Sequence, residues 1–173
     1  MKIILIVLGI LAALVLLVVV VGWSLPVRHR ASRQATYTPP PETVFEAITK
    51  FEEFPQWRSK VQRVEMVDRT TGAQSFREIG SDGSILYSVN EALPGQRLIT
   101  RIADKSLPFG GKWTYELTPA DGGGTQLRIT EDGEVYNPIY RFMSRFVFSH
   151  HATIDAYLTD LGKKFGNPVA ITD

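Results

Sequence analysis

The hydrophobic pattern divides the chain into two unlike parts, and the first part is a continuous apolar segment. From Ile3 to Val21 no residue is more polar than Gly9. As a helix this segment would be about 28 Å long, which is close to the thickness of the hydrocarbon core of a bilayer. We therefore predict a transmembrane helix over residues 3–21, within an N-terminal anchor of residues 1–27.

A cleaved signal peptide is the competing interpretation of this segment. The apolar stretch of a signal peptide is usually about 7 to 15 residues long, and Val20-Val21-Gly22 is a poor match to a small-x-small cleavage site. The sequence therefore favours an uncleaved, single-pass anchor. The side of the membrane that holds the rest of the chain stays open, because Lys2 precedes the helix while Arg28, Arg30 and Arg33 follow it.

Beyond residue 27 the apolar residues alternate with polar ones, which is the pattern of strands with one covered face. Trp113, Tyr115 and Leu117 give the clearest alternation. The expected strands cover residues 30–37, 61–68, 75–79, 85–92, 97–103, 112–118 and 125–130. Turn signals rich in glycine separate them, for example at Thr71-Gly72, Asp82-Gly83 and Gly110-Gly111. Consecutive strands with such short links predict an antiparallel meander.

Helices are expected on both sides of this meander in the sequence. Residues 42–49 and 51–57 predict two short helices after a Pro-rich link. Residues 139–165 predict one helix about 40 Å long with a broad apolar face. That face holds Ile139, Met143, Phe146, Val147, His150, Ile154, Tyr157, Leu158, Leu161 and Phe165. The resulting order, β-α-α-β6-α, is that of an α+β domain.

This element order, together with three short motifs, resembles the START-like helix-grip (SRPBCC) superfamily, in its polyketide cyclase/dehydrase and lipid-transport branch. The motifs are Pro41-Glu42-Thr43-Val44-Phe45, Phe54-Pro55-Gln56-Trp57 and Lys112-Trp113-Thr114-Tyr115-Glu116-Leu117. The resemblance covers residues 28–166 and leaves residues 167–173 as a C-terminal tail. It implies a curved, seven-stranded antiparallel sheet wrapped around a long C-terminal helix, with an apolar cavity between them. Because the similar proteins are bacterial, the membrane it implies is the bacterial inner membrane.

Composition excludes several classes of function. The 19 Lys and Arg residues are balanced by 18 Asp and Glu residues, so no basic surface for nucleic acid is expected. The chain has no cysteine, which rules out disulfides, thiol nucleophiles and thiolate metal sites. With three histidines and no phosphate-binding or hydrolase motif, we expect neither a metal nor a cofactor.

Two residues are candidates for acid–base chemistry. His150 lies in the middle of the predicted apolar face, where its imidazole would hold a ligand headgroup or transfer protons near neutral pH. Glu131 shares the inward parity of Leu127 and Ile129 and would present a carboxylate at the mouth of the cavity. The alternatives are a core histidine bonded to a neighbouring strand and a solvated turn carboxylate.

Aromatic residues dominate the faces expected to turn inward, and they favour an apolar ligand. The candidate ligand-binding residues are Trp57, Tyr87, Trp113, Tyr115, Met143, Val147, His150, Ile154 and Tyr157. Our first hypothesis is a membrane-anchored, non-enzymatic protein that binds a lipid or other hydrophobic small molecule. The alternatives are a cyclase/dehydratase-like enzyme that uses His150, and a ligand-free partner-binding module such as a scaffold or a coenzyme Q-related chaperone.

Overall fold

One antiparallel sheet of seven strands, in the order β1-β7-β6-β5-β4-β3-β2, is the frame of the computed structural model. The structure describes residues 2–70, 74–81, 83–147 and 149–173, so the predicted turn at Thr71-Gly72 and the Asp82 position of the next turn lie outside the described residues. The strands are β1 (Arg28–Tyr37), β2 (Val61–Asp68), β3 (Ser75–Gly80), β4 (Gly83–Leu93), β5 (Arg97–Ile102), β6 (Phe109–Pro119) and β7 (Thr125–Val135). The predicted meander, β2 to β7, is confirmed, and its last strand pairs with β1.

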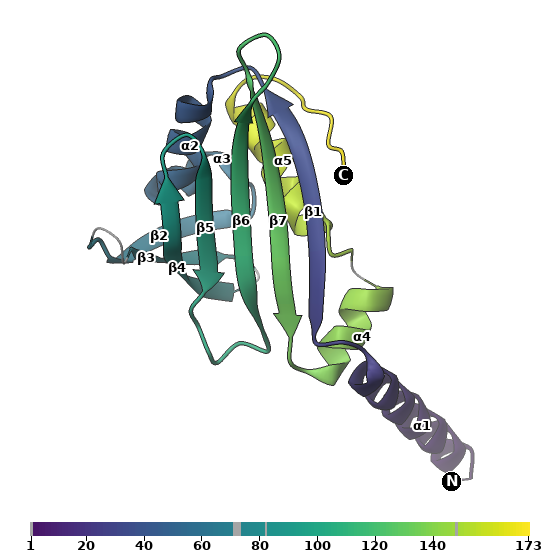
Figure 1. Cartoon of the computed structure of the whole chain (residues 1–173). Coiled ribbons are helices and arrows are strands. Elements are labelled where there is room, and N and C mark those ends of the chain that lie inside the picture. The colour runs from purple at the N-terminus through teal and green to yellow at the C-terminus, as the bar shows by residue number, and fades with distance from the viewer. Residues whose placement is uncertain (1, 71–73, 82, 148) are drawn as a thin grey trace.

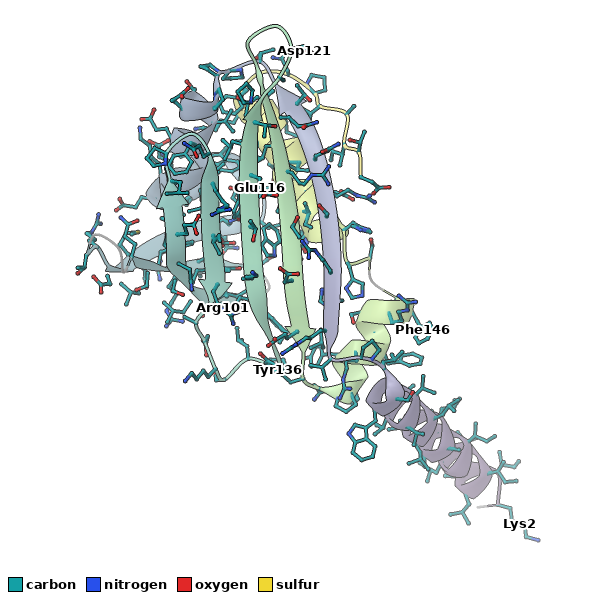
Figure 2. The ribbon with its side chains drawn as sticks, in the orientation of Figure 1. Lys2, Arg101, Glu116, Asp121, Tyr136 and Phe146 are labelled. Carbon is teal, nitrogen blue, oxygen red and sulfur yellow. The ribbon has the colours of Figure 1, made fainter. Side chains whose placement is uncertain are left out.

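Helices cover one face of this sheet and leave the other to solvent (Figure 1). The covering elements are α2 (Pro41–Thr49), the short 3-10 helix η1 (Phe51–Glu53), α3 (Phe54–Trp57) and α5 (Ala152–Lys164). Arg101 and Glu116 project from the opposite, solvent-facing side (Figure 2). Register shifts in β2 and β4 bend these strands, so the covered face is concave.

The core lies between α5 and the nearest strands. From the sheet come Leu98, Leu117, Leu127 and Ile129, and from α5 come Ile154, Leu158 and Leu161, all of which are at most 5% exposed. Burying each of these side chains contributes about 2 kcal/mol. The alternation of the strands and the apolar stripe of residues 154–161 thus both agree with the sequence pattern.

Strands β6 and β7 continue past their predicted ends. The turn expected at Gly110-Gly111 does not form, because Gly111 pairs with Gly133 and the ladder runs on to Val135. Gly111 has a φ of 133°, and a Cβ there would overlap the carbonyl oxygen of Asp132. The two facing glycines therefore extend the hairpin, and Glu131 lies inside a strand rather than in a turn.

The prediction of one helix over residues 139–165 is wrong. The segment forms two helices, α4 (Pro138–Phe146) and α5, joined by a short link. Asn137 caps α4 by accepting the N–H of Ile139 at 2.9 Å, and the Ser149 hydroxyl accepts the N–H of His151 at 3.2 Å just before α5 begins. The Asn137 cap gives α4 its own start, and the Ser149 contact orders the chain just before α5, whose N-cap residue His151 makes no side-chain cap.

The N-terminal helix α1 (Lys2–Ser24) extends away from the sheet and packs against α4 at its C-terminal end (Figure 1). It is long and apolar enough to cross a membrane, a criterion that a signal sequence near the N-terminus also meets. Gly22 is buried, and a Cβ there would overlap the carbonyl oxygen of Pro138. Arg141 of α4 donates to the Leu25 carbonyl at 2.9 Å and to the Trp23 carbonyl at 3.4 Å. The last carbonyl groups of a helix have no N–H partner within the helix. Arg141 provides hydrogen-bond donors for two such carbonyl groups at the C-terminal end of α1.

The C-terminal tail, residues 167–173, folds back onto β1. Gln34 and Thr172 exchange two backbone hydrogen bonds, of 2.9 and 3.0 Å. Val169 and Ile171 pack against the core. The tail therefore forms one isolated antiparallel bridge with β1, on the edge of β1 that faces away from β7.

Candidate functional site

Tyr157, on α5, is the centre of an aromatic cluster on the concave face of the sheet. Its ring lies 5.3 Å from that of Trp57, 5.6 Å from that of Tyr115 and 6.0 Å from that of Trp113, measured between ring centres. Trp57 comes from α3, whereas Tyr115 and Trp113 come from adjacent inward positions on β6. Four of the nine predicted ligand residues are thereby brought together.

Phenylalanines connect this cluster to Tyr87, a fifth predicted residue. Tyr87 on β4 stacks on Phe76 of β3 at 5.3 Å, and Phe76 contacts Phe54 of α3, which in turn contacts Trp57. Tyr87 and Trp113 remain half-buried, although both lie on central strands. We call the set Trp57, Tyr87, Trp113, Tyr115 and Tyr157 the aromatic cluster.

A charged pair is embedded in the aromatic cluster. Arg58 Nη1 lies 2.5 Å from Glu78 Oε2, and the two side chains are only 15% and 16% exposed. The guanidinium lies over the rings of Phe54 and Tyr157, about 5 Å from each ring centre. Burial is the largest single influence and lowers the pKa of Arg58, but Glu78 and the nearby tyrosines together raise it by more, so the net shift is upward. Arg58 is therefore a fixed positive charge inside an apolar wall.

Two buried donors of the aromatic cluster make no hydrogen bond of ordinary geometry, the Nε1 of Trp57 and the hydroxyl of Tyr157, which lies beside the hydroxyl of Tyr115. Burial raises the pKa of Tyr157 well above its usual value, so the hydroxyl keeps its proton at all physiological pH values. Nearly all buried polar groups in folded proteins are paired, because an unpaired one costs about 1 to 3 kcal/mol. The cluster therefore combines apolar walls with two donors that the protein itself does not pair.

The remaining predicted ligand residues lie elsewhere. Ile154 is fully buried in the filled part of the core. Met143 belongs to α4, and Val147 follows it and is 58% exposed. Because α4 turns away from the sheet, these two residues do not join the aromatic cluster, as a single straight helix would have required.

His150 lies in the link between α4 and α5, beside the other end of the concave face. Its ring stacks on that of His29 at 4.0 Å, and His29 Nε2 lies 3.3 Å from Glu131 Oε1. Glu131 thus contacts His29 rather than His150. The three residues form a half-buried cluster in which imidazole and carboxylate are adjacent, and an acid–base role for His150 stays a prediction.

Acid pH is expected to destabilise the protein through His150. Burial, and then the nearby charge of His29, lower the pKa of His150; Arg145 and His151 act in the same direction, while Glu131 opposes them. The unfolded chain then binds a proton more readily than the folded one. Stability from this group is complete above about pH 6.5 and falls as the pH drops through the lower, folded-state pKa.

The measurement is the urea midpoint of the full chain in detergent at neutral and at mildly acidic pH. In His150→Gln the drop in midpoint on acidification should be smaller than in the wild type. An equal drop in the two proteins would show that His150 does not cause the acid sensitivity.

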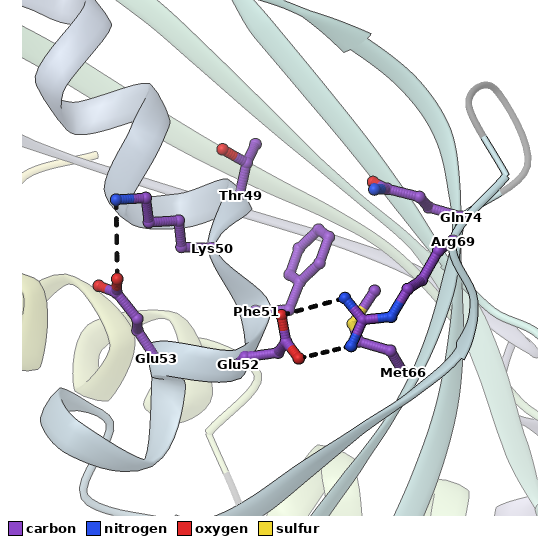
Figure 3. Close-up of a pocket in the computed structure, with 8 residues that line it drawn as sticks. All are labelled: Thr49, Lys50, Phe51, Glu52, Glu53, Met66, Arg69 and Gln74. Atoms are coloured by element: carbon purple, nitrogen blue, oxygen red, sulfur yellow. Dashed lines mark hydrogen bonds and ion pairs between the residues drawn. The ribbon is translucent and has the colours of Figure 1, made fainter.

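Two surface hollows lie apart from the aromatic cluster. One, of about 400 Å³, is lined by Thr49, Lys50, Phe51, Glu52, Glu53, Met66, Arg69 and Gln74 (Figure 3). Its ionic residues pair with one another, Arg69 with Glu52 and Lys50 with Glu53, which leaves no free charge for a ligand. The other, of about 380 Å³, adjoins the turn between β6 and β7. Neither has the apolar lining expected for a hydrophobic ligand.

Sequence reasoning missed three charged or titratable residues that the fold turns inward. Glu78 follows buried Phe76 by two positions on β3, and His29 precedes buried Ala31 by two on β1. The parity of each strand carried the signal, but the sequence alone did not fix which face of the sheet the Glu78 and His29 side chains occupy. Arg58 had no such signal, since it lies at the end of α3.

A family model supplies the identification. The model described as polyketide cyclase / dehydrase and lipid transport matches residues 28–161, which is more than half of the chain. The chain belongs to this family. No curated protein matches it. The family resemblance seen in the motifs is thus confirmed, and the chain carries a helix-grip domain of the class that binds hydrophobic ligands or is cyclase/dehydrase-like.

Solved structures agree with this family at the level of the fold. A START superfamily protein from Mycobacterium smegmatis is 15% identical, with a TM-score of 0.62 over 80% of this chain and 97% of that one. The Zhui aromatase/cyclase from Streptomyces sp. R1128 is also 15% identical, with a TM-score of 0.63 over 80% and 94%. A conserved protein from Geobacillus kaustophilus is 12% identical, with a TM-score of 0.68 over 84% and 100%. At such identities the likeness shows the fold alone.

Proposed function

We propose that this chain is a membrane-anchored protein that holds a lipid or other hydrophobic small molecule against the aromatic cluster, between the sheet and α5. The observation that carries the proposal is the pair of buried, unpartnered donors, Trp57 Nε1 and the Tyr157 hydroxyl, within otherwise apolar walls. A ligand with an apolar body and one acceptor, such as a carbonyl or a hydroxyl, would satisfy them. Arg58 would favour an acceptor that carries partial negative charge.

Tyr87 gives a second line of support. Burial raises its pKa, yet its side chain retains accessible surface. An accessible aromatic side chain on the concave face would offer a ligand apolar surface to cover. Trp113 is half-buried on the same concave face, in contact with Tyr157.

The membrane part of the proposal rests on α1. Its 23 residues would span about 34 Å as a helix, enough to cross the hydrocarbon core with a short margin. An anchored domain would stay beside the bilayer, where an apolar ligand is concentrated. In this proposal residues 1–27 are the anchor, residues 28–166 are the binding domain, and residues 167–173 are the C-terminal tail that lies along β1.

The test is native mass spectrometry of the full chain in detergent, followed by organic extraction and identification of what is released. A stoichiometric lipid, isoprenoid or similar apolar molecule would support the proposal and give the ligand class. A clean apo mass under conditions that preserve the fold would contradict it and favour the ligand-free partner-binding alternative.

Tyr157→Phe is expected to reduce ligand retention without destabilising the protein. The variant keeps the ring that packs against Trp57 and Trp113 but removes an unpaired buried hydroxyl. Losing one hydrogen bond to the ligand corresponds to about a tenfold loss of affinity. The readouts are the bound fraction by native mass spectrometry and the free energy of unfolding in urea.

Tyr37→Phe is the matched control. The Tyr37 hydroxyl already donates to the Leu158 carbonyl at 2.9 Å. Its removal should lower the free energy of unfolding by about 1 kcal/mol and leave retention unchanged. Equal retention in the Tyr157→Phe and Tyr37→Phe variants would mean that the Tyr157 hydroxyl does not contact the ligand.

A further inference from the structure

Helix α4 has its polar and apolar sides reversed relative to an ordinary surface helix. One of its two arginines, Arg141, is 8% exposed and donates to carbonyls at the end of α1, whereas Ile139, Tyr140 and Phe146 are 45%, 53% and 60% exposed. These three residues and Val147 fall within about 120° of one another on the helix, and Arg145 lies on the opposite side. A soluble protein gains nothing from this arrangement, because it leaves the apolar side in water.

The position of α4 along α1 fixes what it faces. Within α1, exposure falls only over the last turns, at Val18, Val19, Val21 and Gly22, where α4 packs. At 1.5 Å per residue these positions lie within about 6 Å of the end of the apolar segment. If α1 crosses a bilayer, α4 therefore lies at the boundary between acyl chains and headgroups.

The surrounding side chains are those typical of that boundary. Trp23 and Tyr136 are 77% and 50% exposed, and Figure 2 shows Tyr136 and Phe146 at the end of the domain from which α1 extends, with Lys2 at its far end. Trp and Tyr are enriched at membrane interfaces, and an arginine on the polar side of an amphipathic helix suits anionic headgroups.

We propose that the apolar face of α4, made by Ile139, Tyr140, Phe146 and Val147, is embedded in the outer few ångströms of the bilayer that α1 crosses. The inference rests on the proposed membrane anchoring but not on the proposed ligand. Gly22 and Arg141 join α4 rigidly to α1, so embedding both would fix the orientation of the domain. The link that carries His150 would then lie close to the membrane surface, at the start of α5.

The experiment uses the full chain in vesicles of phosphatidylcholine and phosphatidylglycerol. Because the chain has no cysteine, single labels can be placed at Ile139→Cys and Phe146→Cys on the apolar face, and at Arg145→Cys and Val67→Cys as controls. Arg145 lies on the polar side of α4, and Val67 is 59% exposed on β2, far from α1. Each site carries an environment-sensitive fluorophore and is quenched either by doxyl-labelled lipid or by aqueous iodide.

The labels on the apolar face are expected to lose most of their fluorescence to doxyl lipid and little to iodide, and the two control labels are expected to do the reverse. If the protein floats with the vesicles but all four labels respond alike to iodide, α4 is not embedded and the anchor stands. If the protein does not float with the vesicles, the anchor itself is refuted, and the inference about α4 falls with it.

Discussion

Glu78→Gln is expected to lower the free energy of unfolding by about 3 kcal/mol. The substitution leaves the Arg58 guanidinium charged and buried among aromatic rings without its counter-charge. Breaking a buried ion pair on one side typically costs about 3 to 5 kcal/mol for this reason. Urea unfolding of the full chain in detergent measures the change.

Two controls separate this effect from simple loss of an ion pair. The double variant Arg58→Met with Glu78→Leu removes both charges, and such replacements by apolar residues are often neutral, so its stability should be near that of the wild type. Glu52→Gln breaks the exposed pair with Arg69 and should change stability little. If Glu78→Gln lowered the free energy of unfolding as little as Glu52→Gln does, the Arg58 charge would have to be hydrated in the folded state.

Gly22→Ala is expected to separate α4 from α1. Any Cβ at residue 22 would overlap the Pro138 carbonyl oxygen, and this atom belongs to the backbone at the start of α4 and cannot rotate away. The displaced helix would also lose the two hydrogen bonds that Arg141 donates to the end of α1. Amide hydrogen exchange in α4 should rise by about tenfold or more, because the helix then opens locally at lower cost.

Gly9→Ala is the matched control for this variant. It also lies in α1, but a Cβ there meets no atom within 4 Å, so exchange in α4 should stay at the wild-type rate. Equal exchange in the Gly22→Ala and Gly9→Ala variants would show that the contact between α1 and Pro138 does not hold α4 in place.

Most of the fold could be predicted from the sequence because period-two and period-3.6 patterns depend on burial alone. Leu127 and Ile129 on β7, and Leu158 and Leu161 on α5, are buried as their spacing requires. The break between α4 and α5 could not be predicted in this way. The spacing of apolar residues over 139–147 is the same whether that side of the helix packs on a sheet or is exposed. The spacing therefore does not show which of the two environments the helix occupies.

The candidate site was only partly predictable, for a related reason. Inward parity identified Tyr87, Trp113 and Tyr115, since strand alternation fixes which face a side chain occupies. Parity does not say which inward residues meet one another. The pairing of Arg58 with Glu78 joins the end of a short helix to a strand 20 residues later, and that contact depends on how the sheet packs on α3.

The return of the C-terminal tail to β1 would matter most if α1 confines the protein to the plane of a membrane. β1 is at the edge of the sheet, and a free edge can pair with the same edge of another copy. Copies held in one plane, in a common orientation, would bring such edges together far more often than copies in solution. By occupying the outward backbone groups of Gln34, Thr172 interrupts the free edge near its middle and leaves only short stretches for pairing. The tail would thereby limit edge-to-edge pairing at the β1 edge of the sheet.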